Sequence, residues 1–190
     1  MLFRSKDKPF FLYFSPFAIH APLNDTPKKF TSRITKKTNL LEKQYGGAVA
    51  AVDDQVGKIL KVLSAHNLDK NTLIILSSDN GPHYNKGGSS APYRGGKGSD
   101  TQYEGWVHVP TIARWPGHIP SGSTHKGLAC TLDFYATFAE VSGRKTPDYC
   151  DGKSLVPYLK GEKSGDVHES ISWYSADPKD HPRRHLSAVR

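Results

Sequence analysis

The chain has 190 residues, enough for one ordinary domain or for part of a larger one. Hydrophobic residues make up 36% and charged residues 23%, and the 17 glycines and 13 prolines predict that much of the chain is loop. No run approaches the roughly 18 apolar residues of a membrane-spanning helix, and the first ten residues lack the apolar core of a signal peptide. Two cysteines, Cys130 and Cys150, exclude a disulfide-rich scaffold and a four-ligand zinc module.

The charge is strongly basic, with 26 lysines and arginines against 18 acidic residues and a formal net charge of +8. Such a balance favours polyanionic partners, which include nucleic acid, anionic lipid and sulfated or phosphorylated substrates. Two clusters, one within Lys28–Lys37 and one within Lys179–Arg190, hold much of the excess. Neither cluster is interleaved with stacking aromatic residues, so a solvated loop is the simpler interpretation of both.

The first half of the chain predicts a strand, a helix and a second strand. The apolar run Phe10–Phe14 predicts a strand buried on both faces. Apolar residues then recur at steps of three and four across Tyr45–Leu63, which predicts an amphipathic helix. A second apolar run, Thr72–Leu76, predicts another buried strand. This order is typical of a parallel α/β sheet with a right-handed crossover.

The second half predicts shorter elements around a long, glycine-rich loop. In chain order these are the loop His83–Glu104, a strand at Thr111–Trp115, a helix with Thr131 as N-cap and Gly143 as its stop, a short helix at Ser154–Leu159 and a strand at Ile171–Tyr174.

Three candidate functional residues follow the two predicted strands of the first half. In parallel sheets, ligands gather outside the carboxyl ends of the strands, and His20, Asp79 and Asn80 all lie just past such an end. Asp79 and Asn80 supply the hard oxygen ligands that hold calcium or magnesium, although Asn80-Gly81 alone also predicts a simple turn. His20 is a candidate proton donor or anion contact, because imidazole titrates near neutral pH.

The glycine-rich loop carries a fourth candidate, Lys97. Its spacing does not fit a phosphate-binding loop, since Ala91 stands where the first glycine is needed and Gly98 where the magnesium-binding hydroxyl is needed. A lysine on a loop with exposed backbone is suited to holding an oxyanion. The alternative is a loop without a binding role.

The sequence blocks, taken in order, resemble those of the formylglycine-dependent sulfatases. The resemblance extends over nearly the whole chain, and the order of many short blocks makes it specific. The blocks are Phe10–Phe14 with His20-Ala21-Pro22, Ala51–Gly57, Ser77–Gly81, Arg94–Gly98, Tyr103-Glu104-Gly105, Val109-Pro110, Arg114–Gly117, and Asp151–Leu155 with Pro157 and Leu159.

The resemblance implies an alkaline-phosphatase-like α/β fold with a mostly parallel sheet flanked by helices, incomplete at both ends. Residues 1–165 would belong to the catalytic α/β domain, and residues 166–190 would begin a smaller C-terminal subdomain. It also implies that Asp79 and Asn80 hold part of a calcium site, that Lys97 binds the sulfate group, and that His20 contacts the sulfate and assists the departing alcohol.

The implied function is that of a calcium-dependent sulfuric ester hydrolase (sulfatase) acting on a sulfated aryl compound or carbohydrate. The implied partner is a sulfated small molecule or polysaccharide, with no nucleic acid and no membrane span, and the implied location is secreted, periplasmic or lysosomal. The alternatives are a phosphodiesterase- or phosphatase-like enzyme of the same superfamily and a polyanion-binding module without catalysis.

Three departures from the family pattern bear on activity. The formylglycine nucleophile of the family is made from a cysteine (or serine) in a Cys-x-Pro-x-Arg type motif, and neither Cys130 nor Cys150 lies in one. We therefore expect this chain alone to be inactive. In addition, Trp106 replaces a usual glycine, which would strain a backbone of positive φ, and His108 replaces a usual arginine.

Overall fold

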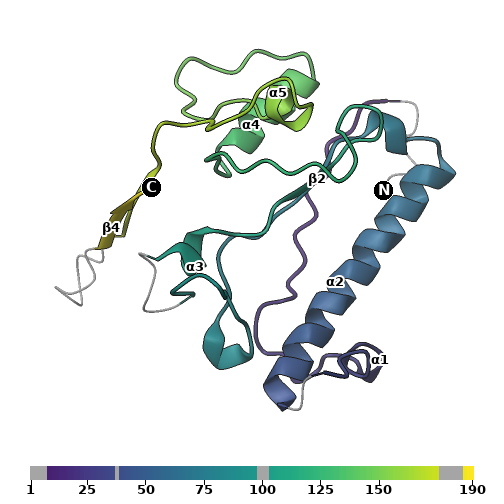
Figure 1. The fold of residues 1–190 in the computed structure, drawn as a ribbon. Helices are drawn as coiled ribbons and strands as arrows, with labels where there is room; N and C mark the ends of the chain where they lie inside the picture. The colour runs from purple at the N-terminus through teal and green to yellow at the C-terminus, as the bar shows by residue number, and fades with distance from the viewer. Residues whose placement is uncertain (1–7, 37–38, 98–102, 176–185) are drawn as a thin grey trace. The chain divides into compact units, whose positions relative to one another are not determined.

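The computed structural model describes residues 8–36, 39–97, 103–175 and 186–190 (Figure 1). The chain divides into two compact units, one made of Met1–Thr72 with Ser77–Pro110 and the other of Leu73–Leu76 with Thr111–Arg190. The elements in order are α1 (Lys28–Thr31), α2 (Leu40–Ala65), η2 (Asp69–Asn71), β1 (Ile74–Leu76), η3 (Tyr84–Lys86), α3 (Glu104–Val107), β2 (Ile112–Arg114), α4 (Asp133–Val141), α5 (Val156–Leu159), β3 (Ser172–Ser175) and β4 (Leu186–Val189).

The long helix α2 is the main element of the first unit, and it extends the predicted helix at both ends. Its start is capped by the Asn39 side chain, which accepts a hydrogen bond of 2.8 Å from the backbone N–H of Leu41. Shortly after its end, Asn67 adopts a left-handed conformation with φ of 56°, which turns the chain out of the helix. Short helix α1 packs beside the N-terminal part of α2 and buries Phe30 there (Figure 1).

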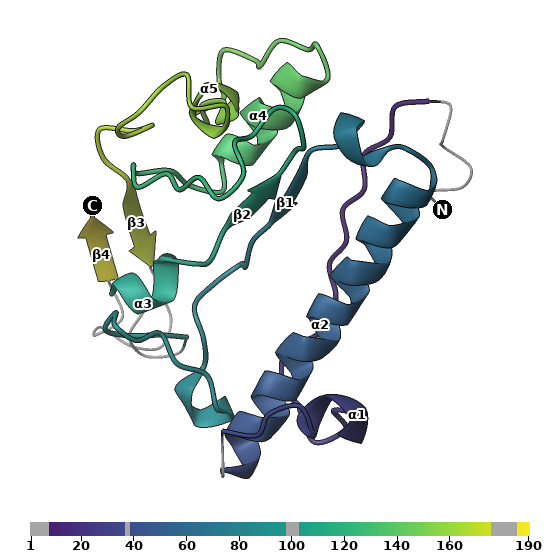
Figure 2. The same ribbon diagram turned by 45° about the vertical axis from the view of Figure 1, so that its right-hand side comes forward.

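Strands β1 and β2 lie where the sequence predicts strands, but their pairing differs from the predicted sheet. They pair antiparallel, with Ile75 opposite Ala113 (Figure 2). Strands β3 and β4 also pair antiparallel, with Trp173 opposite Ala188. Among the described residues no two strands pair in parallel, so the structure shows strands and helices of an α/β chain but not the expected parallel sheet.

The prediction of a buried strand at Phe10–Phe14 is wrong for this structure. The segment forms no strand, and its side chains are largely exposed, with Phe11 at 72% and Tyr13 at 81%. An apolar run indicates a preference for burial, whereas a strand also needs a neighbouring strand to bond with its N–H and C=O groups. The described pairing of β1, the strand predicted to lie beside it, is with β2.

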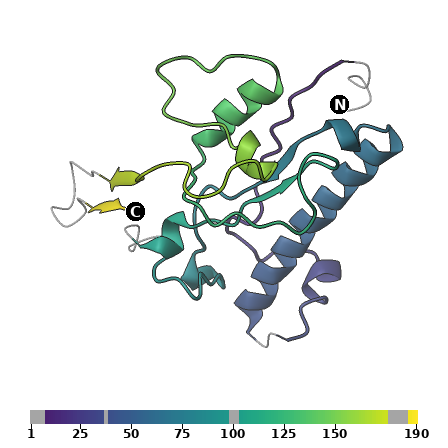
Figure 3. The same ribbon diagram turned by 45° about the horizontal axis from the view of Figure 1, so that its top comes forward.

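Helices α4 and α5 pack together in the second unit (Figure 3). The Thr137 hydroxyl of α4 donates to the carbonyl of Asp133 (2.6 Å) and accepts from the backbone N–H of Leu155 (2.9 Å), which ties the start of α5 to α4. The predicted N-cap at Thr131 is wrong, because α4 begins at Asp133 and no side chain caps it. Apolar residues buried in this unit are Ala136, Leu155, Val156 and Val167.

The described helices include none that is both long enough and apolar enough to cross a membrane. The boundaries of the two units do not lie at residue 165. The boundary expected there, between the catalytic domain and a C-terminal subdomain, stays a prediction.

Candidate functional site

Asp79 and Asn80 lie in the turn that directly follows β1 in the chain. The Ser78 hydroxyl donates a hydrogen bond of 2.9 Å to the carbonyl of Asn80, which holds the turn. Asp79 is exposed and Asn80 is half-buried, so oxygen ligands remain accessible on this turn. Because calcium takes six to eight oxygen ligands, these two residues can supply only part of a coordination shell.

Glycines let the turn, the glycine-rich loop and α3 approach one another closely. A Cβ on Gly96 would lie 2.6 Å from the carbonyl oxygen of Pro82, and one on Gly105 would lie 2.7 Å from that of Arg94. Two backbone hydrogen bonds use this closeness, from Lys97 N–H to Pro82 (2.9 Å) and from Gly105 N–H to Arg94 (2.7 Å). The three segments therefore form one packed platform, which places the Lys97 backbone beside the turn of Asp79 and Asn80.

Hydrogen bonds within the loop that carries Lys97 also stabilise its conformation. The Tyr84 hydroxyl donates to the carbonyl of Gly95, and the Ser90 hydroxyl bonds the same carbonyl at 2.7 Å. Gly95 itself has a φ of 80°, a conformation that favours glycine. Lys97 is half-buried, and among the described residues no acidic side chain pairs with its ammonium group.

His20 belongs to the same unit, but no hydrogen bond links it to Asp79, Asn80 or Lys97 among the described residues. Its ring is exposed, and Nδ1 donates to the carbonyl of the neighbouring Ala21 at 2.7 Å. With the proton of the neutral ring on Nδ1, Nε2 is the nitrogen available to a ligand. The structure thus joins three of the four predicted residues through the backbone, and the roles of all four stay predictions.

Two of the departures from the family pattern, Trp106 and His108, are accommodated within α3 and after it. Trp106 lies inside helix α3, where φ is not positive, so the expected strain does not arise. His108 bonds Glu104 through Nδ1 (3.2 Å) and packs on the ring of Tyr93 with centroids 4.4 Å apart. This position therefore carries a side chain that is packed against its neighbours.

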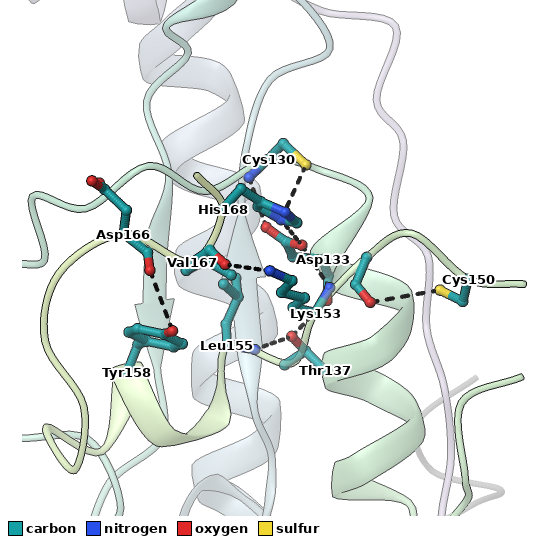
Figure 4. Close-up of polar contacts among 11 residues, drawn as sticks. Cys130, Asp133, Thr137, Cys150, Lys153, Leu155, Tyr158, Asp166, Val167 and His168 are labelled. Atoms are coloured by element: carbon teal, nitrogen blue, oxygen red, sulfur yellow. Dashed lines mark hydrogen bonds and ion pairs between the residues drawn. The ribbon is translucent and has the colours of Figure 1, made fainter. Parts of the chain in front are cut away.

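The structure also gathers a polar cluster that sequence reasoning missed, formed by Cys130, Asp133 and His168 (Figure 4). His168 lies 35 residues after Asp133, and no spacing rule connects them. The only signal in the sequence was a charged residue among the apolar positions of α4, since Asp133 stands beside Leu132 and Phe134.

Comparison with known protein families gives two matches. Residues 2–143 match the family described as Sulfatase. Residues 100–190 match the family described as N-sulphoglucosamine sulphohydrolase, C-terminal.

Individual relatives agree with the family matches. The chain is 39% identical to N-acetylgalactosamine-6-sulfatase of Mus musculus over 165 residues, which cover 83% of this chain and 30% of the relative. It is 34% identical to human arylsulfatase A over 179 residues, which cover 92% of this chain and 33% of the relative. The chain thus spans about a third of the length of these relatives.

Solved structures show the same likeness in the fold. The structure of Ps i-CgsB in complex with k-i-k-neocarrahexaose is similar with a TM-score of 0.78 and 32% identity, covering 91% of this chain and 37% of that one. A phosphonate monoester hydrolase from Silicibacter pomeroyi, 23% identical with a TM-score of 0.53 over 73% of this chain and 26% of its own, shares the fold. Because the Sulfatase match extends from residue 2 to residue 143, the chain belongs to the sulfatase family.

Proposed function

We propose that the protein to which this chain belongs hydrolyses sulfuric esters, and that these 190 residues supply part of the sulfate-binding and calcium-binding machinery. The observation that carries the proposal is the packed platform of the sulfatase-family chain. It holds the backbone of Lys97 within one hydrogen bond of the segment that follows Asp79 and Asn80.

In this proposal Lys97 binds the sulfate group. Lys97 is half-buried, and no acidic side chain among the described residues pairs with its ammonium group, so a sulfate oxygen can pair with it. A lysine in such a position stabilises the negative charge of the ester in a site from which water is partly excluded. His20 contacts the sulfate through Nε2 and, when protonated, gives a proton to the departing alcohol.

Asp79 and Asn80 would hold a calcium ion together with ligands from outside this chain. The donor set fits, because a carboxylate and an amide oxygen are both ligands that calcium accepts. The ion would supply positive charge beside the sulfate oxygens. The two residues present only part of a shell, so the site is complete only with further oxygen ligands.

The bond-breaking nucleophile is assigned to another part of the protein. Neither Cys130 nor Cys150 lies in a Cys-x-Pro-x-Arg motif from which a formylglycine is made. Residues 1–190 therefore bind and orient in this proposal, and they do not cleave on their own. We infer accordingly that the isolated chain turns over no sulfate ester.

A sulfated carbohydrate is the substrate class that we propose, in a secreted, periplasmic or lysosomal enzyme. Support comes from relatives named for N-acetylgalactosamine-6-sulfate chemistry and from the carrahexaose bound to a similar structure. The net charge of +8 adds attraction for a polyanionic chain. A phosphatase-like enzyme is the second candidate, because a phosphonate monoester hydrolase has the same fold.

The test compares substrates in the full-length enzyme. We expect turnover of an aryl sulfate that exceeds turnover of the matching aryl phosphate and phosphodiester, and that falls on calcium chelation and returns when calcium is restored. Faster hydrolysis of the phosphate substrates would overturn the assignment in favour of the second candidate. Tight binding of a sulfated polysaccharide with no turnover of any ester would favour a non-catalytic binding module instead.

A further inference from the structure

Cys130, Asp133 and His168 bring three different metal-binding side chains to one point of the second unit (Figure 4). Their ligand atoms all lie within 4.8 Å of one another. The Nε2 atom of His168 lies 2.7 Å from an oxygen of Asp133 and 3.9 Å from the sulfur of Cys130. None of the residues assigned to the sulfate site takes part in this cluster.

The cluster is built on a rigid carboxylate. Asp133 is fully buried, and its two oxygens accept hydrogen bonds of 2.8 Å from the backbone N–H groups of Cys130 and Lys153. The Lys153 ammonium donates to the carbonyl of Val167 at 3.1 Å, which holds the segment that carries the neighbouring His168. The three ligands are therefore positioned by the fold, as a metal site requires.

The same atoms do not fit a catalytic pair in which Cys130 is the nucleophile and His168 the base. The nitrogen of His168 that faces the sulfur is the one that bonds Asp133, so it cannot both donate to the carboxylate and accept the thiol proton. Burial, together with the charge of Asp133, raises the pKa of the Cys130 thiol, which keeps it protonated at neutral pH. An activated cysteine needs the opposite shift.

We propose that Cys130, Asp133 and His168 form a binding site for one zinc ion. Zinc accepts thiolate, imidazole and carboxylate ligands together, whereas calcium and magnesium prefer oxygen alone. Tetrahedral geometry with zinc bond lengths sets the sulfur–nitrogen distance near ~3.5 Å and the nitrogen–oxygen distance near ~3.4 Å. The present distances are 3.9 Å and 2.7 Å, so binding would bring the sulfur and the nitrogen slightly closer and move the nitrogen away from the carboxylate oxygen. A water molecule would fill the fourth position.

Binding requires defined changes of protonation. The Cys130 thiol releases its proton to solvent and bonds the ion as thiolate, and the proton of His168 moves to Nδ1 so that Nε2 offers its lone pair. The hydrogen bond between His168 and Asp133 is replaced by two bonds to the ion. Zinc would thereby link the first residue of α4 to the segment before β3.

The experiment uses Co²⁺ as a spectroscopic substitute for zinc on the 190-residue chain at neutral pH with the cysteines reduced. We expect a thiolate-to-cobalt charge-transfer band that saturates at one equivalent and disappears when Zn²⁺ is added. Cys130→Ser should abolish the band, and His168→Gln should weaken cobalt binding at least tenfold. Cys150→Ser is the matched control, because its thiol lies near the carbonyl of Gly152 and outside the cluster, so the band should be unchanged.

Two results would overturn the site. One is the absence of a thiolate band at one equivalent of cobalt in the unsubstituted chain, which needs no variant to interpret. The other is a band that survives in Cys130→Ser and is lost in Cys150→Ser. Circular dichroism of the unsubstituted chain and of each variant, all without metal, shows whether the chain is folded, and zinc titration by calorimetry gives the stoichiometry independently of cobalt.

Discussion

Single lysines in this chain differ in what surrounds them, and that difference decides which of them can affect catalysis. Lys97 is half-buried and its backbone is bonded to Pro82, next to the turn of Asp79 and Asn80. Lys28 and Lys36 are exposed. A charge held in a partly dry site interacts strongly with a bound anion, whereas an exposed charge is screened by water and salt.

We therefore predict that Lys97→Ala lowers kcat/KM of the full-length enzyme on a small aryl sulfate far more than Lys28→Ala or Lys36→Ala does. Losing one partner of a buried, hydrogen-bonded charge pair costs about 2–5 kcal/mol, which corresponds to about 30-fold to several-thousand-fold in rate. The two exposed variants should stay within a few-fold and depend on salt. Equal effects of all three substitutions would remove Lys97 from the sulfate site.

The Cys130 thiol gives a second prediction for a single residue. Because burial and the nearby Asp133 raise the pKa of Cys130, less of it is thiolate at pH 8 than in an unfolded chain. We predict slow alkylation of Cys130 by iodoacetamide in the metal-free chain, faster alkylation as the pH rises further, and loss of the protection in denaturant. Peptide mapping by mass spectrometry measures each site. Equal rates of Cys130 alkylation in the folded and the unfolded chain would contradict the burial of its thiol.

At the scale of elements, the helices were largely predictable and the strand pairing was not. The spacing of apolar residues across Tyr45–Leu63 predicts α2 because one stripe of a helix must face the rest of the protein. The run Phe10–Phe14 carries no information about a partner strand, and the structure assigns no strand to it. The cluster around Asp133 depends on contacts across 35 residues, which no local pattern encodes.

The glycines of α2 and α3 give a prediction for these elements. Gly57 lies in α2 with nothing within 4 Å of the place where a Cβ would sit, so Gly57→Ala should stabilise the fold by about 0.5–1 kcal/mol. A Cβ on Gly105 would instead meet backbone oxygens of the glycine-rich loop, so Gly105→Ala should destabilise it by roughly 1–3 kcal/mol. The midpoint of urea unfolding measures both changes, and shifts of the same sign would contradict the packing described for the platform.

At the scale of the whole chain, the distribution of apolar side chains determines how the isolated protein behaves. The described residues bury few large apolar groups, among them Phe30, Leu63 and Leu155. Marginal burial gives marginal stability, because the conformational entropy lost on folding is large. The aromatic residues of the segment 11–17 are exposed at the same time.

We predict that the isolated chain self-associates through this aromatic segment. Phe11, Tyr13 and Phe17 are each more than 70% exposed within seven residues, and contiguous apolar surface of this kind drives association in water. The double variant Phe11→Ser/Tyr13→Ser should shift the sedimentation distribution toward monomer and reduce the fluorescence of bound anilinonaphthalene sulfonate. Tyr149→Ser is the matched control, because Tyr149 is 88% exposed but has Asp148 and Cys150 as its neighbours, and removing a single exposed aromatic should leave association unchanged. A chain that is monomeric at micromolar concentration and melts cooperatively would show that the segment does not drive association. If Tyr149→Ser shifted the sedimentation distribution as much as the double variant, the contact would lie elsewhere on the surface.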